Sequence, residues 1–138
     1  MNSPGFLVLT ADTVVVLGRR VLGKPANYSQ AAQYLRLLSG KTHEVITGIS
    51  LLESGTTNVW QGAEVTQVQF KILNEAEISE YVAGGEPMDK AGAYAIQGEG
   101  KKFVSSFTGS WSNVVGLPLE RLEKVILENG WNVRRSTP

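Results

Sequence analysis

The feature that most constrains the fold is a run of aliphatic residues that contains a single acid. Residues 7–17 read LVLTADTVVVL, and Gly18 followed by two arginines ends the run. Valine and leucine at this density, closed by a turn signal, predict a mostly buried β-strand. A carboxylate inside such a strand is costly unless it is paired or binds a metal. We therefore expect Asp12 to be either a paired structural anchor or a working acid or base.

Size and composition limit the classes of protein that the chain can represent. Its 138 residues suit one domain, and 42% apolar residues are enough for a core. Basic and acidic residues balance at 13 each, which argues against a nucleic-acid-binding protein. The lack of cysteine excludes disulfides and thiolate metal sites, and no apolar run reaches the length of a membrane helix. We expect a cytoplasmic α/β protein that binds neither nucleic acid nor membrane.

Periodicity along the rest of the chain predicts both helices and strands. In the first part of the chain we expect a short return strand from Val21 and a helix capped by Asn27 or Ser29 and running to Leu38. Strands over 42–52 and 58–73 are expected to form an antiparallel hairpin. The second part is expected to contain a helix over 75–83 capped by Asn74, a strand over 102–108, and a helix from Pro118 to Asn129. The apolar positions change parity between Val65 and Val68, which predicts a bulge or a bend. Segments 86–100 and 109–116 are expected to be loops, and the first has the polar side chains of a binding loop.

Three apparent signatures of catalysis do not hold. Residues 39–42 (SGKT) end like a P-loop, but the earlier glycine is absent and a strand follows where a helix belongs. Residues 98–100 (GEG) begin like a dinucleotide fingerprint, but Phe103 stands in place of the third glycine. His43 is the only histidine and no G-x-S-x-G elbow accompanies it, so we interpret it as a structural, hydrogen-bonded residue.

The remaining polar candidates suit polyphosphate chemistry. They are Asp12, Thr13, Lys24, Asp89, Lys90 and Gln97. Carboxylates bind Mg²⁺ or Mn²⁺ and accept protons from water, and lysines supply charge to phosphate oxygens. The Gln97 amide has both a donor and an acceptor, so it can read the edge of a base. Asp89 and Lys90 have a simpler interpretation as an exposed ion pair.

Six motifs occur in an order that resembles the Maf family of nucleotide pyrophosphatases. They are ADTVVV (11–16), LGKP (22–25), LSGKTHEV (38–45), TG (47–48), DKAGAYAIQG (89–98) and SNVVGLPL (112–119). The similarity extends from about Leu7 to Leu127. It implies one Maf-like domain over residues 1–138, of α/β class, with an elongated mixed β-sheet, flanking helices and a cleft, as in inosine triphosphate pyrophosphatases.

The resemblance also implies an activity and a set of site residues. The activity is hydrolysis of a nucleoside triphosphate to the monophosphate and pyrophosphate, with Mg²⁺ or Mn²⁺ as the metal. By resemblance, Asp12 is the proton acceptor and metal ligand, and Lys24 contacts the phosphates. Lys90, a candidate from its charge alone, is a further possible phosphate-binding residue. Thr13 and Gln97 are tied to the choice of base. The THEV, AIQG and WSNVVG forms are similar to the branch that acts on dTTP and UTP.

One departure from the family pattern adds further expectations. Family members begin with a strand and a Ser- and Arg-rich loop of the form S-x-S-P-R-R, whereas this chain begins MNSPGF. We therefore expect a domain truncated at its N-terminus, whose exposed sheet edge favours a homodimer. Without the arginines phosphate binding would be weaker, so the alternative to an enzyme is a nucleotide-binding regulatory module with little or no turnover. A purely structural partner protein is a third reading.

Overall fold

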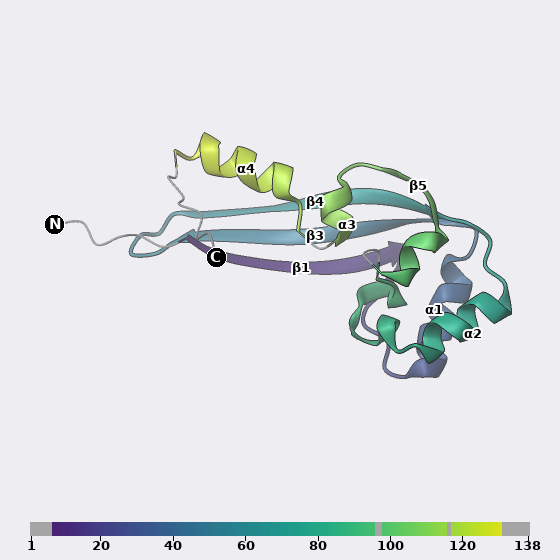
Figure 1. Cartoon of the computed structure of the whole chain (residues 1–138). Helices are drawn as coiled ribbons and strands as arrows, with labels where there is room; N and C mark the ends of the chain where they lie inside the picture. The colour runs from purple at the N-terminus through teal and green to yellow at the C-terminus, as the bar shows by residue number, and fades with distance from the viewer. Residues whose placement is uncertain (1–6, 96–97, 116, 131–138) are drawn as a thin grey trace.

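The computed structural model describes residues 7–95, 98–115 and 117–130, and it contains one long sheet with a helical lobe at one end (Figure 1). The strands are β1 Leu7–Leu17, β2 Arg20–Leu22, β3 Thr42–Glu53, β4 Val59–Phe70 and β5 Val104–Thr108. The helices are α1 Tyr28–Leu38, α2 Glu75–Ala83, α3 Trp111–Val115 and α4 Leu119–Glu128, with 3-10 helices η1 Glu86–Asp89, η2 Ala91–Ala93 and η3 Glu99–Phe103.

The sheet has the strand order β2-β1-β3-β4-β5 within the described residues. The expected α/β class, with an elongated sheet and flanking helices, is confirmed. The resemblance implied a mixed sheet, but every described strand pair is antiparallel. The predicted hairpin of the two long strands is confirmed as β3 and β4, which pair along their whole length.

Local sequence signals set the starts of the helices. The Asn27 side chain accepts a hydrogen bond of 2.8 Å from the backbone N–H of Gln30 and so begins α1. Asn74 and Glu77 form a reciprocal capping box at the start of α2. Pro118 immediately precedes α4, as expected. No helix in this described part of the chain has the length and hydrophobicity that a bilayer span requires.

The bulge predicted between Val65 and Val68 is wrong, and the irregularity of β4 lies later, where its register with β5 shifts between Gln69 and Phe70. β4 keeps an unbroken register with β3 from Val59 to Gln69. Val59 and Val65 share one face of β4 and are exposed, whereas Val68 lies on the opposite face and is buried. The change in parity therefore marks apolar residues on both faces of a strand that pairs regularly with β3.

The segment 109–116, predicted as a loop, contains the short helix α3. Ser110 Oγ accepts a hydrogen bond of 3.1 Å from the backbone N–H of Asn113 and so stabilises the first turn. The loop prediction is wrong because serine and glycine indicated a turn, whereas here the serine caps a helix.

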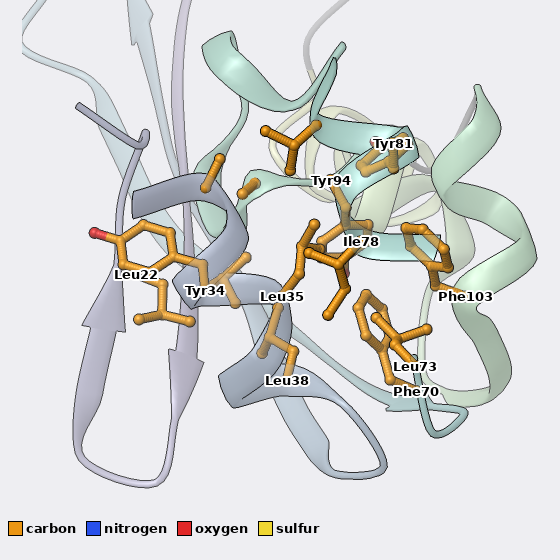
Figure 2. Packing of buried hydrophobic residues seen from close by; sticks show 14 of the residues in the cluster. Leu22, Tyr34, Leu35, Leu38, Phe70, Leu73, Ile78, Tyr81, Tyr94 and Phe103 are labelled. Carbon is orange, nitrogen blue, oxygen red and sulfur yellow. The ribbon is translucent and has the colours of Figure 1, made fainter. Parts of the chain in front are cut away.

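The main core fills the lobe, where α1 and α2 pack together beside the inner end of the sheet (Figure 2). Aromatic rings form its centre: the ring centroids of Phe70 and Tyr94 are 4.8 Å apart, and those of Tyr81 and Phe103 are 4.9 Å apart. Leucines from α1, including the fully buried Leu35, surround them. Ile78, Tyr81 and Val82 of α2 are buried in the same core.

A second, smaller cluster lies at the other end of the sheet. Ile49 and Leu51 of β3 pack there against Leu122 and Val125 of α4, with Trp60 at the margin. Figure 1 shows α4 lying over this outer end, away from the lobe. The larger core alone contains the aromatic cluster, so the two ends of the sheet are stabilised to different extents.

The register assigns alternate residues of β1, β3 and β4 to a covered face and an open face. The covered face contains both core clusters and carries the paired residues Thr13 and Thr47. On the open face two cross-strand rows are apolar: the first apolar row is Val8, Leu52 and Val59, and the second apolar row is Val14, Ile46 and Val65. All open-face residues of these three strands are exposed or half-buried.

β1 is much less buried than predicted. Val15 is its one buried residue, and Asp12 is exposed. Before Val15 the outer side of β1 pairs with none of the described strands, and every second side chain lies on the open face. The expectation of a mostly buried strand, with Asp12 as a buried acid, is therefore wrong because aliphatic composition does not reveal whether both faces and both edges are covered.

Candidate active site

A cavity of about 520 Å³ opens where β1, the end of β2 and the segment after α2 meet. Its polar lining comes from Asp12, Thr13, Lys24, Asp89, Lys90 and Tyr94. The aliphatic side of the lining includes Val15 and Val45 from the main core. The cavity therefore brings together all polar candidates from the sequence except Gln97, which lies outside the described residues.

Asp12 and Thr13 are neighbours in β1 and lie on opposite faces of the sheet. Thr13 Oγ1 is 2.9 Å from Thr47 Oγ1 on the covered face. Asp12 pairs with Gly48 and borders both the cavity and a shallower hollow over this glycine. It forms no ion pair with another described residue. An exposed, unpaired carboxylate at a cavity rim is accessible to water and to a cation.

A close backbone contact attaches the segment that carries Lys90 to the turn that carries Lys24. The Gly92 N–H donates a hydrogen bond of 3.1 Å to the carbonyl of Gly23. Gly92 has a φ of +72°, and a Cβ at this position would lie 2.8 Å from Cγ2 of Val15. Only glycine fits here without displacing β1 or the segment. The lysines are thus held on two elements that pack directly together.

Asp89 and Lys90 form an ion pair as well as lining the cavity. Lys90 Nζ lies 3.5 Å from Asp89 Oδ2, with the two side chains 47% and 75% exposed. An ion pair this exposed contributes little to stability. Its lysine can therefore exchange the aspartate for a phosphate oxygen at small cost.

His43 and Tyr94 form a neutral pair beneath the charged residues. His43 is 1% exposed, and its Nε2 lies 2.7 Å from the Tyr94 hydroxyl. Burial lowers the pKa of His43 to about 4, and burial raises the pKa of the Tyr94 phenol. Both groups are uncharged at neutral pH, which agrees with the structural interpretation of His43. The charge around the cavity comes from the lysines and aspartates.

Asn113 supports the site, and sequence reasoning gave it no role. It is fully buried, and its Nδ2 lies 3.0 Å from the carbonyl oxygen of Val45, 3.1 Å from that of Glu64 and 3.0 Å from Thr66 Oγ1. These contacts fix α3 on the sheet, and the next residue, Val114, lines the cavity. The signal was the SNVVG motif, in which an asparagine stands among apolar residues.

The carboxylates suit a metal that binds together with a phosphate ligand. The described residues include no group of three or more His, Cys, Asp or Glu side chains placed to hold a metal. Asp12 and Asp89 both line the cavity. Mg²⁺ commonly keeps several waters and binds one or two carboxylates along with substrate phosphates. This donor set fits that mode of binding.

Comparison with known proteins places these residues in a wider context. Residues 2–129 match the family described as Maf-like protein. The chain is 50% identical over 127 residues to the dTTP/UTP pyrophosphatase of Pelotomaculum thermopropionicum, covering 92% of this chain and 66% of that protein. It is 49% identical over 121 residues to the dTTP/UTP pyrophosphatase of Bdellovibrio bacteriovorus, covering 88% and 63%.

A third relative carries a broader description. The nucleoside triphosphate pyrophosphatase of Xylella fastidiosa is 50% identical over 119 residues, which cover 86% of this chain and 62% of that protein. The chain thus spans slightly less than two thirds of the length of these curated relatives. Residues 2–129, which match the family, contain every residue of the cavity lining.

Proposed function

Because this chain belongs to the Maf family, we propose that it hydrolyses a nucleoside triphosphate to the monophosphate and pyrophosphate. The observation that carries the proposal is the cavity whose lining includes Asp12, Lys24 and Lys90. A triphosphate is strongly anionic, and two lysines on one wall offer it point charges. The relatives named dTTP/UTP pyrophosphatase support dTTP and UTP as the substrates.

In the proposed reaction Asp12 accepts the proton of the attacking water. Its carboxylate is exposed and therefore accessible to water. Water attacks a phosphorus atom, the phosphoanhydride bond breaks, and pyrophosphate leaves. Lys24 and Lys90 stabilise the negative charge that develops on the phosphate oxygens.

The proposal assigns binding roles to the remaining residues. Thr13 and Gln97 select the base, and Thr13 has its hydroxyl beside Thr47 at the cavity wall. Asp12, together with Asp89, would hold Mg²⁺ or Mn²⁺, which neutralises phosphate charge when bound. A cytoplasmic location belongs to the same proposal, because free nucleoside triphosphates are cytoplasmic metabolites.

The competing proposal is a regulatory module that binds a nucleotide without turnover. In its favour, the lysines that line the cavity, Lys24 and Lys90, are its only cations among the described residues. Two charges only partly neutralise a triphosphate. Calorimetric titration with dTTP distinguishes the two proposals, since binding without pyrophosphate release selects the module.

The enzyme proposal is tested by measuring pyrophosphate release from dTTP, UTP, CTP and GTP with Mg²⁺ or Mn²⁺. Asp12→Asn is expected to lower kcat at least about 100-fold, because it removes the proton acceptor. Glu44→Gln is the matched control: Glu44 lies on the same open face but does not line the cavity. Equal turnover by Asp12→Asn and the unaltered chain would show that the role of Asp12 is wrong.

A second variant pair tests the phosphate contact. Lys24→Gln is expected to lower kcat/KM, because it removes charge next to the triphosphate. Lys41→Gln changes an exposed lysine that does not line the cavity and should leave kcat/KM unchanged. If both variants behave alike, Lys24 does not contact the phosphates.

A further inference from the structure

The buried pair of His43 and Tyr94 has no role in the reaction proposed above. His43 is 1% exposed and Tyr94 is 5% exposed, and the Tyr94 hydroxyl lies 2.7 Å from His43 Nε2. Tyr94 lines the cavity, whereas His43 does not. Polar groups buried this deeply are costly unless they find hydrogen-bond partners. The hydrogens of the pair therefore need acceptors.

The second ring nitrogen of His43 has no partner. Its Nδ1 is buried and forms no hydrogen bond with any residue that the structure describes. The side chain is enclosed by the chain itself, so bulk water does not reach this nitrogen. A hydrogen on Nδ1 would therefore be a buried donor without an acceptor, which is rare in proteins.

The neutral imidazole carries one hydrogen, and the position of this hydrogen decides the role of Tyr94. If the hydrogen is on Nδ1, Tyr94 donates to Nε2 and the Nδ1–H has no acceptor. If the hydrogen is on Nε2, the imidazole donates to the Tyr94 oxygen, and the phenol keeps a hydrogen of its own to donate. Among the described residues, His43 is the one hydrogen-bond partner of this hydroxyl.

Each arrangement thus leaves one hydrogen without an acceptor in the described part of the chain, and only the one on Tyr94 belongs to a residue that lines a cavity. We propose that His43 donates through Nε2 to Tyr94 and that the Tyr94 hydroxyl donates to a phosphate oxygen of the bound nucleotide. Tyr94 is then a binding residue, and His43 is a positioning residue that acts through it. The inference rests on the proposed function, because it takes the occupant of the cavity to be a nucleoside triphosphate.

The chemistry of the cavity favours a phosphate as the acceptor. Lys24 and Lys90 line the same cavity as Tyr94, and their charges attract a polyphosphate. Ionised phosphate oxygens accept hydrogen bonds and donate none, so they select the arrangement in which Tyr94 is the donor. Burial raises the pKa of the Tyr94 phenol, so the phenol keeps its hydrogen beside the lysines.

The chain on both sides of Tyr94 is held in place. The preceding residue, Ala93, has a φ of +65°, a left-handed conformation that is uncommon for residues other than glycine. Backbone strain of this kind clusters at ligand sites. The following residue, Ala95, donates a backbone hydrogen bond of 2.8 Å to the Tyr81 hydroxyl. The Tyr94 ring itself packs edge to face on Phe70, and the hydroxyl is therefore fixed before a ligand binds.

The position of the imidazole hydrogen gives the first test, because the chain contains one histidine. In protein labelled with ¹⁵N-histidine, the ¹⁵N chemical shifts show which ring nitrogen carries the hydrogen. We expect it on Nε2, both in the free protein, where cavity water accepts from Tyr94, and with inorganic pyrophosphate and Mg²⁺ present. A hydrogen on Nδ1 in either sample would overturn the inference. That outcome does not depend on turnover, so it would leave the proposed function standing.

Removal of the Tyr94 hydroxyl gives the second test. Inorganic pyrophosphate with Mg²⁺ is the probe, because the proposed reaction releases pyrophosphate and does not consume it. Tyr94→Phe is expected to raise its Kd, measured by calorimetry, at least about 10-fold, because a hydrogen bond to a charged oxygen is lost. Tyr34→Phe is the matched control and should leave the Kd unchanged, since Tyr34 is buried in the same core but does not line the cavity. Circular dichroism checks that both variants are folded.

Thymidine, which has no phosphate, shows which part of the nucleotide Tyr94 contacts. It should bind to Tyr94→Phe and to the unaltered chain with the same affinity. A loss of thymidine affinity in Tyr94→Phe, or a pyrophosphate affinity that this variant leaves unchanged, would overturn the inference alone. An unaltered chain that binds neither pyrophosphate nor dTTP would overturn the proposed function together with the inference.

Discussion

The helical lobe and the outer end of the sheet share the strands β3 and β4 but are stabilised differently. In the lobe, two helices and an aromatic cluster enclose one end of the sheet (Figure 2). At the outer end, α4 is the one described helix that covers a face, and the smaller cluster of Ile49, Leu51, Leu122 and Val125 is buried there. The candidate site lies between the two, at the margin of the larger core. We infer that the lobe holds the site rigid while the outer end opens at lower free energy.

Leucine-to-alanine substitutions at the two ends test this comparison most strongly. Leu35→Ala removes a fully buried side chain from the lobe and is expected to lower the free energy of unfolding by about 2–5 kcal/mol. Leu122→Ala should cost less, because Leu122 is 7% exposed and its cluster is small. Urea unfolding of both variants measures the difference. Equal losses would show that the two ends are equally well packed.

Acid titration should destabilise the lobe through His43. The folded chain holds the pKa of His43 at about 4, below its ordinary value of 6.5, so between these values only the unfolded chain takes up the proton. The free energy of unfolding is therefore unaffected by His43 above about pH 6.5. As the pH drops from 6.5 toward 4, it falls by roughly 1.4 kcal/mol per pH unit.

Urea unfolding between pH 4.5 and 6.5 measures this slope. His43→Gln cannot take up a proton in this range, so its free energy of unfolding should change less with pH than that of the unaltered chain. The same slope in both chains would assign the acid sensitivity to other groups.

Asn113 attaches α3 to β3 and β4, and its loss should destabilise the fold less than the loss of the Leu35 side chain. Asn113→Ala removes the side-chain hydrogen bonds to the carbonyls of Val45 and Glu64, at an expected cost of about 1–3 kcal/mol. Asn129→Ala is the control, since Asn129 donates one side-chain bond of 2.8 Å to Val125 at an exposed helix end. Thermal unfolding ranks the two variants, and a larger loss for Asn129→Ala would contradict the role of Asn113.

Exposed ion pairs should have the smallest effect at either end. Arg36 and Glu75 join α1 to α2 in the lobe with an N–O distance of 2.9 Å, while their side chains are 51% and 67% exposed. At this exposure water and salt screen the pair, so Arg36→Gln should change the unfolding midpoint very little. Measurements at low and high salt test this. A clear loss at low salt that disappears at high salt would mean that surface charge contributes to the stability of the lobe.

The element pattern could be predicted from the sequence because its signals are local. Asn27 and Asn74 cap helices through their own side chains, and the aliphatic spacing of α1 places Leu35 and Leu38 in the core. The environment of β1 could not be predicted in this way. Whether Asp12 is buried depends on which strands and helices cover the sheet, and that is a property of the tertiary structure.

The candidate site was only partly accessible to sequence reasoning. Asp12, Thr13 and Lys24 were identified through motifs, and they line one cavity. The contribution of Asn113 was missed because its acceptors come from residues far away in the chain, such as Val45 and Glu64. Contacts over such distances leave no periodic signal in a single sequence.

The paired hydroxyls of Thr13 and Thr47 have a consequence for recognition. Each hydroxyl has one hydrogen and can accept as well as donate, and either oxygen can be the donor of the 2.9 Å contact. When Thr47 donates, the Thr13 hydrogen is free to point toward the cavity; when Thr13 donates, only its lone pairs remain available there. Rotation of the two hydroxyl hydrogens therefore lets Thr13 either donate a hydrogen bond to a carbonyl or accept one from an N–H of a bound ligand, without any heavy atom moving.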